Sequence, residues 1–282
     1  MKFYIVIPAH NEESTIALTL ESLAKQTLIP QHIVVVNDNS ADNTKAIVEN
    51  LANQYNFISL VDNNSSNAHL PGSKIINAFN KGLESLDDDY DVICKFDADL
   101  IFPEQYLETL AEHFKSDNQL GMAAGFCYIQ KNDQWVLEDL TNKDHIRGAL
   151  KAYRKQCFFD IGKLKPSIGW DTVDEMLASY YNWKRFTDDS LHVKHLKPTG
   201  ISYSASAKLA QGEALFKLRY GLTLTFITAL KMALKKRNLN VLIHYLKGYF
   251  KAKSDGLDYL VTEDQGKFIR DLRWKGIFSK FA

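Results

Sequence analysis

Residues 3–13 read Phe-Tyr-Ile-Val-Ile-Pro-Ala-His-Asn-Glu-Glu, a short apolar run that ends in a cluster of polar side chains. A run of this kind, rich in β-branched and aromatic residues, predicts a buried strand from its first five residues. The next segment, residues 13–26, carries Ile16, Leu20 and Leu23 at helical spacing and predicts a helix. A strand followed by a helix is the repeating unit of α/β proteins, so this opening sets the expected fold class.

The same alternation continues to about residue 115. Further strands are predicted at 32–36, 57–61 and 91–96, and further helices at 41–54, 75–86 and from 103 to about 115. We expect Ser40 to introduce the helix at 41–54, with Asp42 in its first turn, where the helix dipole favours a carboxylate. Such a series predicts a mainly parallel, Rossmann-like sheet flanked by helices.

The second half of the chain is less regular. It predicts a strand at 122–130, a helix at 147–159, a short helix at 172–181 and a strand at 184–193. From about residue 211, apolar side chains recur every three or four positions, which predicts a C-terminal helical appendage. We therefore expect an α/β domain over 1–210, with halves at 1–115 and 116–210, followed by a basic amphipathic helical tail over 211–282.

The composition excludes several classes of protein. Hydrophobic residues make up 45% and charged residues 24% of the 282, which argues against a disordered or disulfide-scaffold protein. The 34 basic and 34 acidic side chains cancel, so the chain lacks the positive field of a general nucleic-acid binder. Cys94, Cys127 and Cys157 form no C-x-x-C pair and indicate neither a disulfide framework nor a thiolate zinc site, which fits a reducing compartment.

The basic residues are unevenly distributed along the chain. Residues 214–254 contain nine Lys or Arg and no Asp or Glu. Apolar positions such as Leu222, Phe226 and Leu230 are interspersed with these charges, which is typical of amphipathic helices that lie on an anionic membrane surface. The alternative is a helical cap whose charges are simply exposed to solvent.

Two short apolar segments bear on location. The N-terminal run is too short for the apolar region of a signal peptide. The most lipid-like segment, Tyr220–Leu230, has eleven residues, whereas roughly 20 are needed to span a bilayer. We therefore expect a cytoplasmic protein, either free or at the inner face of the cell membrane.

Polar residues follow three of the predicted strands directly, at 8–13, 37–42 and 97–99. Ligands of an open parallel sheet bind outside the carboxyl ends of its strands, so we expect these residues to face one crevice. There, Asp97 and Asp99 form a D-x-D pair, which suits a hard divalent cation that takes its remaining ligands from phosphate oxygens. The alternative is a solvated strand end or a helix cap. Apolar neighbours favour the cation, because half-buried unpaired carboxylates are costly.

The usual phosphate-binding loops do not occur in the sequence, neither G-x-x-x-x-G-K-[ST] nor G-x-G-x-x-G. P-loop and G-x-G-x-x-G dinucleotide enzymes are therefore disfavoured. A nucleotide could instead be held by an Asp that recognises the base, by backbone near residues 8–12 and by a metal on the diphosphate, and Asp38 and Asp97 are placed for this. Lys74 and Arg154 could approach phosphate oxygens, although a solvated Lys or Arg is the commoner case.

In their order and spacing these residues resemble the inverting family-2 glycosyltransferases, which have the GT-A fold. The likeness extends over most of the chain. The matching positions are Pro8, Asn11, Glu12 and Glu13 for a P-x-x-N-E-E opening; Asp38, Ser40, Asp42 and Thr44 for the nucleotide turn; Ala78, Asn80 and Gly82 for A-x-N-x-G; Asp97 and Asp99 for D-x-D; Gly169, Trp170, Asp171 and Asp174 for G-W-D-x-x-D; Lys194–Pro198 for a late H-x-[RK]-P element; and Tyr220 and Gly221 for the start of a helical tail.

The resemblance implies an enzyme with a nucleotide-sugar donor. Residues 1–115 would be its nucleotide-binding half, and 116–210 its acceptor half. The base would lie near Asp38 and the ribose near Asp97, which could also meet the water shell of the metal. The remaining predicted nucleotide-binding residues are Pro8, Asn11 and Glu12.

The resemblance also implies a bound Mg²⁺ or Mn²⁺. Asp99 would be its chief ligand. A neutral imidazole could complete the site, so His195, in the late motif, is a candidate ligand for the metal or the diphosphate. A surface or packed histidine is the alternative.

The general base is expected within residues 169–175. Asp174 matches the motif and lies one helical turn from Asp171, so both share a helix face. Asp171 and Glu175 stay open as alternatives, because Val173 stands where many members carry Glu. The base would take a proton from the acceptor hydroxyl as its oxygen attacks the anomeric carbon opposite the leaving diphosphate, which inverts the configuration. This mechanism requires four acids to converge on one cleft: Asp38, Asp97, Asp99 and Asp174.

The expected reaction is sugar transfer to a saccharide or lipid-linked saccharide in cell-surface glycan synthesis, with no nucleic-acid partner. Transfer to a polyprenyl phosphate is one alternative, because an anionic acceptor needs less from a base. A nucleotidyltransferase is another, disfavoured because no G-x-G-x-R loop follows the first strand. A non-catalytic nucleotide-sugar-binding relative is a third, suggested by Val173 and by Asn37, which stands where Asp is common. Specificity is expected in loops 63–73 and 130–145.

Overall fold

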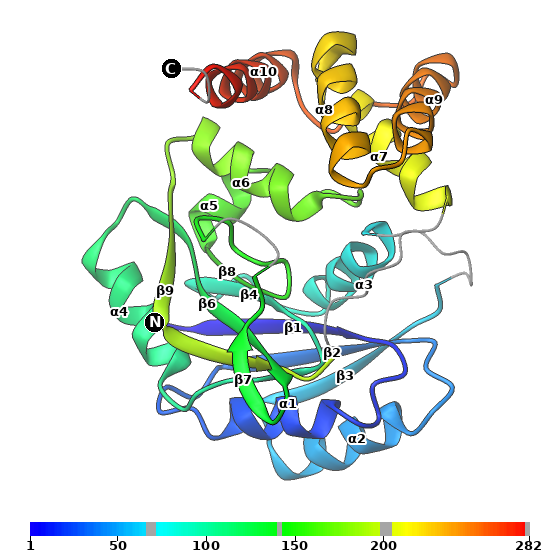
Figure 1. Cartoon of the computed structure of the whole chain (residues 1–282). Helices are drawn as coiled ribbons and strands as arrows, with labels where there is room; N and C mark the ends of the chain where they lie inside the picture. The colour runs from blue at the N-terminus through cyan, green and yellow to red at the C-terminus, as the bar shows by residue number, and fades with distance from the viewer. Residues whose placement is uncertain (66–71, 140–142, 198–204, 280–282) are drawn as a thin grey trace. The chain divides into compact units, whose positions relative to one another are not determined.

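The computed structural model describes residues 1–65, 72–139, 143–197 and 205–279 (Figure 1). Its strands are β1 (Phe3–Ala9), β2 (His32–Asp38), β3 (Ile58–Asn63), β4 (Val92–Phe96), β5 (Leu100–Ile101), β6 (Leu120–Lys131), β7 (Gln134–Leu137), β8 (Leu150–Arg154) and β9 (Lys184–His195). Its helices are α1 (Ile16–Ala24), α2 (Thr44–Gln54), α3 (Ser73–Leu83), α4 (Tyr106–Ser116), α5 (Lys155–Asp160), α6 (Trp170–Tyr180), α7 (Ala205–Lys217), α8 (Gly221–Lys235), α9 (Asn240–Ser254) and α10 (Glu263–Phe278).

The chain divides into two compact units. The first comprises Met1–Ala68, Lys74–Leu164 and Tyr181–Thr199 and contains the whole sheet. The second comprises His69–Ser73, Lys165–Tyr180 and Gly200–Ala282 and contains α6 to α10. The predicted domain boundary at residue 210 stays a prediction.

The sheet of the first unit has nine strands in the described residues, in the order β3-β2-β1-β4-β8-β6-β9-β5, with β7 paired to β6. Strands β1 to β4 run parallel, and the β-branched side chains of β1, β2 and β4 are almost completely buried. Figure 1 shows α1 and α2 on one face of these strands and α3 on the other. The predicted α/β class, with a mainly parallel sheet flanked by helices, is confirmed.

The predicted helix at 147–159 is wrong in its first part. Residues Leu150–Arg154 form β8, which runs antiparallel to both β4 and β6 and fills the space between them. Ala152 and Tyr153 in this strand are fully buried. The segment is rich in good helix formers, but pairing with strands on both sides outweighs that weak local preference. Only Lys155–Asp160 is helical.

A smaller correction concerns the start of α2. The helix begins at Thr44, so Asp42 precedes the first turn instead of lying within it. Its carboxylate accepts hydrogen bonds from the Thr44 backbone N–H at 3.0 Å and from Glu13 N–H at 3.1 Å. Asp42 therefore stabilises the helix start from outside and ties it to the turn after β1.

Strands β6 and β9, each twelve residues long, pair in parallel, and Ile129 lies opposite His195. Short β5 pairs with the end of β9, so Leu100 also lies opposite His195. Because β9 points the same way as β1, β2 and β4, all four strands end at one edge of the sheet. We call this the carboxyl edge.

The second unit consists of helices. Helices α7 and α9 approach closely: a Cβ on Gly212 would lie 1.9 Å from the Tyr245 carbonyl oxygen, and one on Gly248 would lie 2.0 Å from that of Leu209. Helix α10 begins with a capping box between Thr262 and Gln265. Among the described residues, no helix is long and apolar enough to cross a membrane.

Candidate active site

The turns after β1 and β2 are joined by side-chain hydrogen bonds at the carboxyl edge. Asn11 has a left-handed backbone, with φ at 56°, which Asn tolerates better than most residues. Its N–H donates to Ser40 Oγ at 3.0 Å, and its Oδ1 accepts from Ala41 N–H at 2.8 Å. Glu12 N–H donates to Thr44 Oγ1 at 2.7 Å. Two of the predicted nucleotide-binding residues, Asn11 and Glu12, thus join the turn after β1 to the turn after β2.

Asp38 is buried at the end of β2. Its Oδ1 accepts hydrogen bonds from Asn63 Nδ2 at 2.9 Å and Ser65 N–H at 3.3 Å, and Oδ2 lies 3.7 Å from Lys74 Nζ. The predicted phosphate contact Lys74 is therefore at the same edge and next to a predicted nucleotide residue. Asn37 is part of the turn itself: Oδ1 accepts from Ser40 N–H at 3.3 Å.

Arg154 does not belong to this site. It lies opposite Val92, at the start of β4 and therefore at the other edge of the sheet. Its guanidinium donates to the main-chain carbonyls of Phe114, Asp117 and Leu120, where helix α4 ends. The prediction that Arg154 approaches phosphate oxygens is wrong, and so is the alternative of a solvated side chain.

Asp97 has a cationic partner that sequence reasoning missed. The ammonium of Lys95, whose side chain is only 1% exposed, contacts the Asp97 carboxylate and donates to the Gly148 carbonyl at 3.0 Å. The backbone N–H of Asp97 donates to Ala149 O at 2.8 Å. The expectation that this carboxylate lacks a partner without a metal therefore needs correction. A lysine inside the apolar run Val92–Phe96 was the available signal.

The turn that carries Asp99 is held from two sides. Thr19 of α1, fully buried, donates to the Ala98 carbonyl at 2.9 Å and accepts from Leu100 N–H at 3.1 Å. On the other side, Leu196 N–H donates to the Asp99 carbonyl at 2.9 Å. These bonds fix the backbone of the D-x-D pair to α1 and to the end of β9.

His195 and Asp99 meet at this point. His195 Nε2 lies 3.3 Å from Asp99 Oδ2, and Nδ1 lies 2.7 Å from Glu138 Oε2. Burial lowers the pKa of His195, but the hydrogen bonds and charges of Asp99 and Glu138 outweigh burial and raise this pKa to about 9. This pKa favours the imidazolium form at neutral pH, which together with the Arg147 guanidinium would offset the charges of Asp99 and Glu138.

The donor set at Asp99 and His195 fits a divalent metal. A carboxylate oxygen and an imidazole nitrogen are ligands that Mn²⁺ accepts. An ion with ligand distances of about 2.1 Å can contact two atoms that are 3.3 Å apart. The two predicted metal ligands, Asp99 and His195, both lie in the first unit and contact each other directly.

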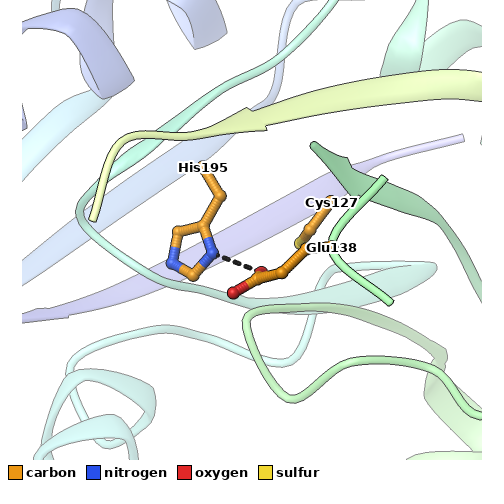
Figure 2. Close-up of side chains that lie close together, drawn as sticks. All are labelled: Cys127, Glu138 and His195. Atoms are coloured by element: carbon orange, nitrogen blue, oxygen red, sulfur yellow. Dashed lines mark hydrogen bonds and ion pairs between the residues drawn. The ribbon is translucent and has the colours of Figure 1, made fainter. Parts of the chain in front are cut away.

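A second group of possible ligands surrounds His195. Figure 2 shows Glu138 facing the His195 ring, with Cys127 beside it, and the three ligand atoms lie within 4.8 Å of one another. Burial raises the pKa of the Cys127 thiol to about 12, which opposes the thiolate form when no metal is bound. Glu138 Oε2 also lies 3.1 Å from the guanidinium of Arg147. These charges favour a hydrogen-bonded cluster over a second metal site.

The end of β9 is also tied to the first turn. Lys197 Nζ lies 2.6 Å from Glu12 Oε2, which in addition accepts from Thr15 Oγ1 at 2.7 Å. Lys197 belongs to the predicted late motif, whose Pro198 is outside the described residues. His192 lies on the exposed side, 3.0 Å from Tyr128 Oη.

Asp174 is in α6 of the second unit. It is 3% exposed, and its Oδ1 accepts a hydrogen bond from Glu175 N–H at 2.6 Å. Glu175 is also buried, and Asp171 lies in the first turn of the helix. The choice of Asp174 as base, and its approach to Asp99, stay predictions.

A mainly parallel sheet with a D-x-D turn and a histidine at its carboxyl edge defines a GT-A-like protein. Residues 4–166, more than half of the chain, match the family model described as Glycosyl transferase family 2. The chain therefore belongs to glycosyl transferase family 2.

One similar protein is the poly-beta-1,6-N-acetyl-D-glucosamine synthase of Staphylococcus aureus (strain COL), 30% identical over 202 residues, which are 64% of this chain and 44% of that protein. The chain spans less than half the length of the curated relatives it matches first.

Two solved structures share the fold. S. aureus TarS 1–349 in complex with UDP-GlcNAc has a TM-score of 0.58 at 18% identity and covers 95% of this chain and 78% of its own. The mannosyltransferase PcManGT from Pyrobaculum calidifontis, in complex with GDP-Man and Mn²⁺, has a TM-score of 0.55 at 14% identity and covers 98% and 80%.

Proposed function

We propose that this chain is an inverting, metal-dependent glycosyltransferase that moves a sugar from a nucleotide-sugar to a hydroxyl acceptor in cell-surface glycan synthesis. The observation that carries the proposal is the buried Asp99–His195 pair at the carboxyl edge, 3.3 Å apart, in a chain of glycosyl transferase family 2. Proteins with the same fold have been solved with UDP-GlcNAc and with GDP-Man and Mn²⁺, which supports a nucleotide-sugar donor. The nucleotidyltransferase alternative loses its support, because the chain belongs to another family.

The donor would bind along the carboxyl edge. Asp38 would contact the base, with Pro8, Asn11 and Glu12 around the nucleotide, and Asp97 would lie near the ribose. Asp99 and His195 would hold a Mg²⁺ or Mn²⁺, which supplies positive charge for the departing diphosphate.

Asp174 would act as general base on the acceptor. It would remove the hydroxyl proton while the acceptor oxygen attacks the anomeric carbon from the face opposite the diphosphate, so the product has inverted configuration. Such a base contributes roughly 10²–10⁴-fold to the rate. Asp174→Asn should therefore lower the transfer rate by that factor while Mn²⁺ affinity stays unchanged.

The test of this function is metal-dependent hydrolysis and transfer with a panel of nucleotide-sugars that includes UDP-GlcNAc and GDP-Man. The wild-type chain should release nucleoside diphosphate from at least one donor with Mn²⁺ and not with EDTA. Asp99→Asn should lose this release, whereas Asp258→Asn, an exposed acid of the second unit, should keep it. A folded wild-type chain that binds a donor without any turnover would instead support the non-catalytic alternative.

The second unit suggests that the acceptor is presented at a membrane. The end of α8 exposes Leu234 at 65%, and the turn before α9 exposes Leu239 at 68%; Lys235, Lys236 and Arg237 lie between them in the sequence. Apolar side chains next to basic ones are the combination that binds anionic leaflets. The chain would then associate peripherally with the inner face of the cell membrane, where a lipid-linked saccharide or a polyprenyl phosphate could be the acceptor.

Co-sedimentation with vesicles tests this association. Each basic residue contributes about 1 kcal/mol, so Lys235→Gln with Arg237→Gln should weaken binding to phosphatidylserine vesicles about 30-fold. The pair Lys267→Gln and Lys275→Gln removes the same charge from α10 and serves as the control. If the chain binds neutral vesicles equally well, or if its binding does not depend on salt, the alternative of a helical cap with solvent-exposed charges is supported instead.

A further inference from the structure

Glu138 is a buried carboxylate whose position does not depend on His195. Its backbone N–H donates to the Cys127 carbonyl at 2.9 Å, which extends the pairing of β6 and β7 by one residue. The guanidinium of Arg147 lies 3.1 Å from its Oε2 and donates to its carbonyl at 3.4 Å. Two separate anchors therefore aim the side chain.

The Glu138 carboxylate holds the Nδ1 edge of the His195 ring. A carboxylate can only accept, so the 2.7 Å contact requires the proton on Nδ1. The opposite nitrogen, Nε2, then faces Asp99. In metal sites, a carboxylate on the second ring nitrogen selects the tautomer that ligates and holds the ring in orientation.

We propose that Glu138 is the positioning residue of the metal site, which orients His195 so that Nε2 and Asp99 bind the same divalent ion. The inference rests on the proposed function, because it takes Asp99 and His195 as the metal ligands. Glu138 itself touches neither substrate nor metal, and it acts through the ring it holds.

The main test is Mn²⁺ binding to the purified 282-residue chain without nucleotide, measured from the EPR signal of free Mn²⁺. Glu138→Gln keeps the shape of the side chain and removes its charge, and it should weaken Mn²⁺ binding about 10- to 100-fold. Asp139→Asn removes the same charge from the neighbouring exposed residue and should bind as the wild type does. Wild-type affinity in Glu138→Gln would overturn the inference.

A double-mutant cycle separates positioning from a general structural effect. In a His195→Ala background, Glu138→Gln should cause no further loss of Mn²⁺ affinity, because the ring through which it acts is gone. A further loss there would show that Glu138 works by another route. Pulsed EPR supplies a second readout: the wild type should show coupling of Mn²⁺ to one imidazole nitrogen, and Glu138→Gln should lose most of it.

Three variants cover the remaining outcomes. If Glu138→Gln does not fold, Glu138→Asp keeps the negative charge but shortens the side chain, which withdraws the carboxylate from Nδ1, so it should show the same weakening. Cys127→Ala should leave Mn²⁺ affinity unchanged; its loss would make the cluster of Cys127, Glu138 and His195 the ion site. If Asp99→Asn binds Mn²⁺ as tightly as the wild type, the metal site of the proposed function fails, whatever Glu138 does.

Discussion

The two acids of the D-x-D turn lie two residues apart, but the regions around them neutralise them differently. Between β4 and β8, Asp97 is paired with the buried ammonium of Lys95. Where β5 meets β9, Asp99 is paired with His195, whose ring is also held by Glu138. An imidazolium loses its proton far more readily than an ammonium. A ring nitrogen of His195 beside Asp99 could exchange its proton for a metal ion, whereas the ammonium beside Asp97 has no lone pair for one.

The largest expected difference is in sugar transfer. Asp99→Asn should lower metal-dependent turnover by about 10³-fold or more, because metal stabilisation of a leaving group amounts to several kcal/mol. Asp97→Asn removes at most a contact to the ribose or to a metal-bound water, so its loss should be about tenfold. Initial rates at saturating Mn²⁺ measure both, with circular dichroism as the check on folding. Equal losses would erase the functional distinction between the two acids.

For the free energy of unfolding, we expect the Asp97 substitution to cause the larger loss and the Asp99 substitution the smaller one. Asp97→Ala leaves the Lys95 ammonium buried without its carboxylate and should cost about 3 kcal/mol of unfolding free energy, the low end for breaking a buried pair because Asp97 is partly exposed. Asp99→Ala should cost about 1 kcal/mol, since His195 keeps Glu138 and can shed its proton. Urea unfolding in EDTA measures both values. A larger loss for Asp99→Ala would contradict the expectation that the Lys95 ammonium depends more on Asp97 than His195 depends on Asp99.

The imidazolium of His195 also predicts that the free energy of unfolding depends on pH when EDTA removes the metal. The folded-state pKa of His195 is raised to about 9, so its contribution to stability is complete below the unfolded value near 6.5 and is lost as pH rises through 9. The wild type should therefore lose on the order of 2 kcal/mol relative to His195→Gln between pH 6.5 and 9. Parallel urea titrations of the two chains give this difference. If the difference in unfolding free energy between the two chains is the same at every pH, the His195 imidazolium does not stabilise the fold.

Much of this edge was predictable because it depends on local patterns. Apolar runs followed directly by polar residues define the parallel strands and their ends, so Asp38, Asp97 and Asp99 could be assigned to one edge. His195 was accessible only through the resemblance to a family, since a lone histidine at a strand end is otherwise uninformative.

The rest depends on pairings between distant segments. The residues of β8 have a local preference for helix, and they form a strand because they pair with β4 on one side and β6 on the other. That error concealed Gly148 and Ala149, whose carbonyls contact Lys95 and Asp97. Glu138 gives no sequence signal, because its partner His195 is 57 positions away. Lys95 did give one, since a lysine within a buried strand must have a polar partner.

A small effect, similar to that of Asp99→Ala, is expected for Lys95→Met, and it separates the buried charge from the contact as the cause of the Asp97 result. The substitution removes the same ion pair as Asp97→Ala, but it leaves the partly exposed carboxylate to water and puts an apolar chain of similar length into the buried position. Because the cost of breaking an ion pair comes from the charge that stays buried, unfolding free energy should fall by only about 1 kcal/mol. Urea unfolding of the two variants side by side tests this. A loss as large as that of Asp97→Ala would mean that the lost ion-pair contact, and not a buried ammonium without its carboxylate, is the cause of the destabilisation.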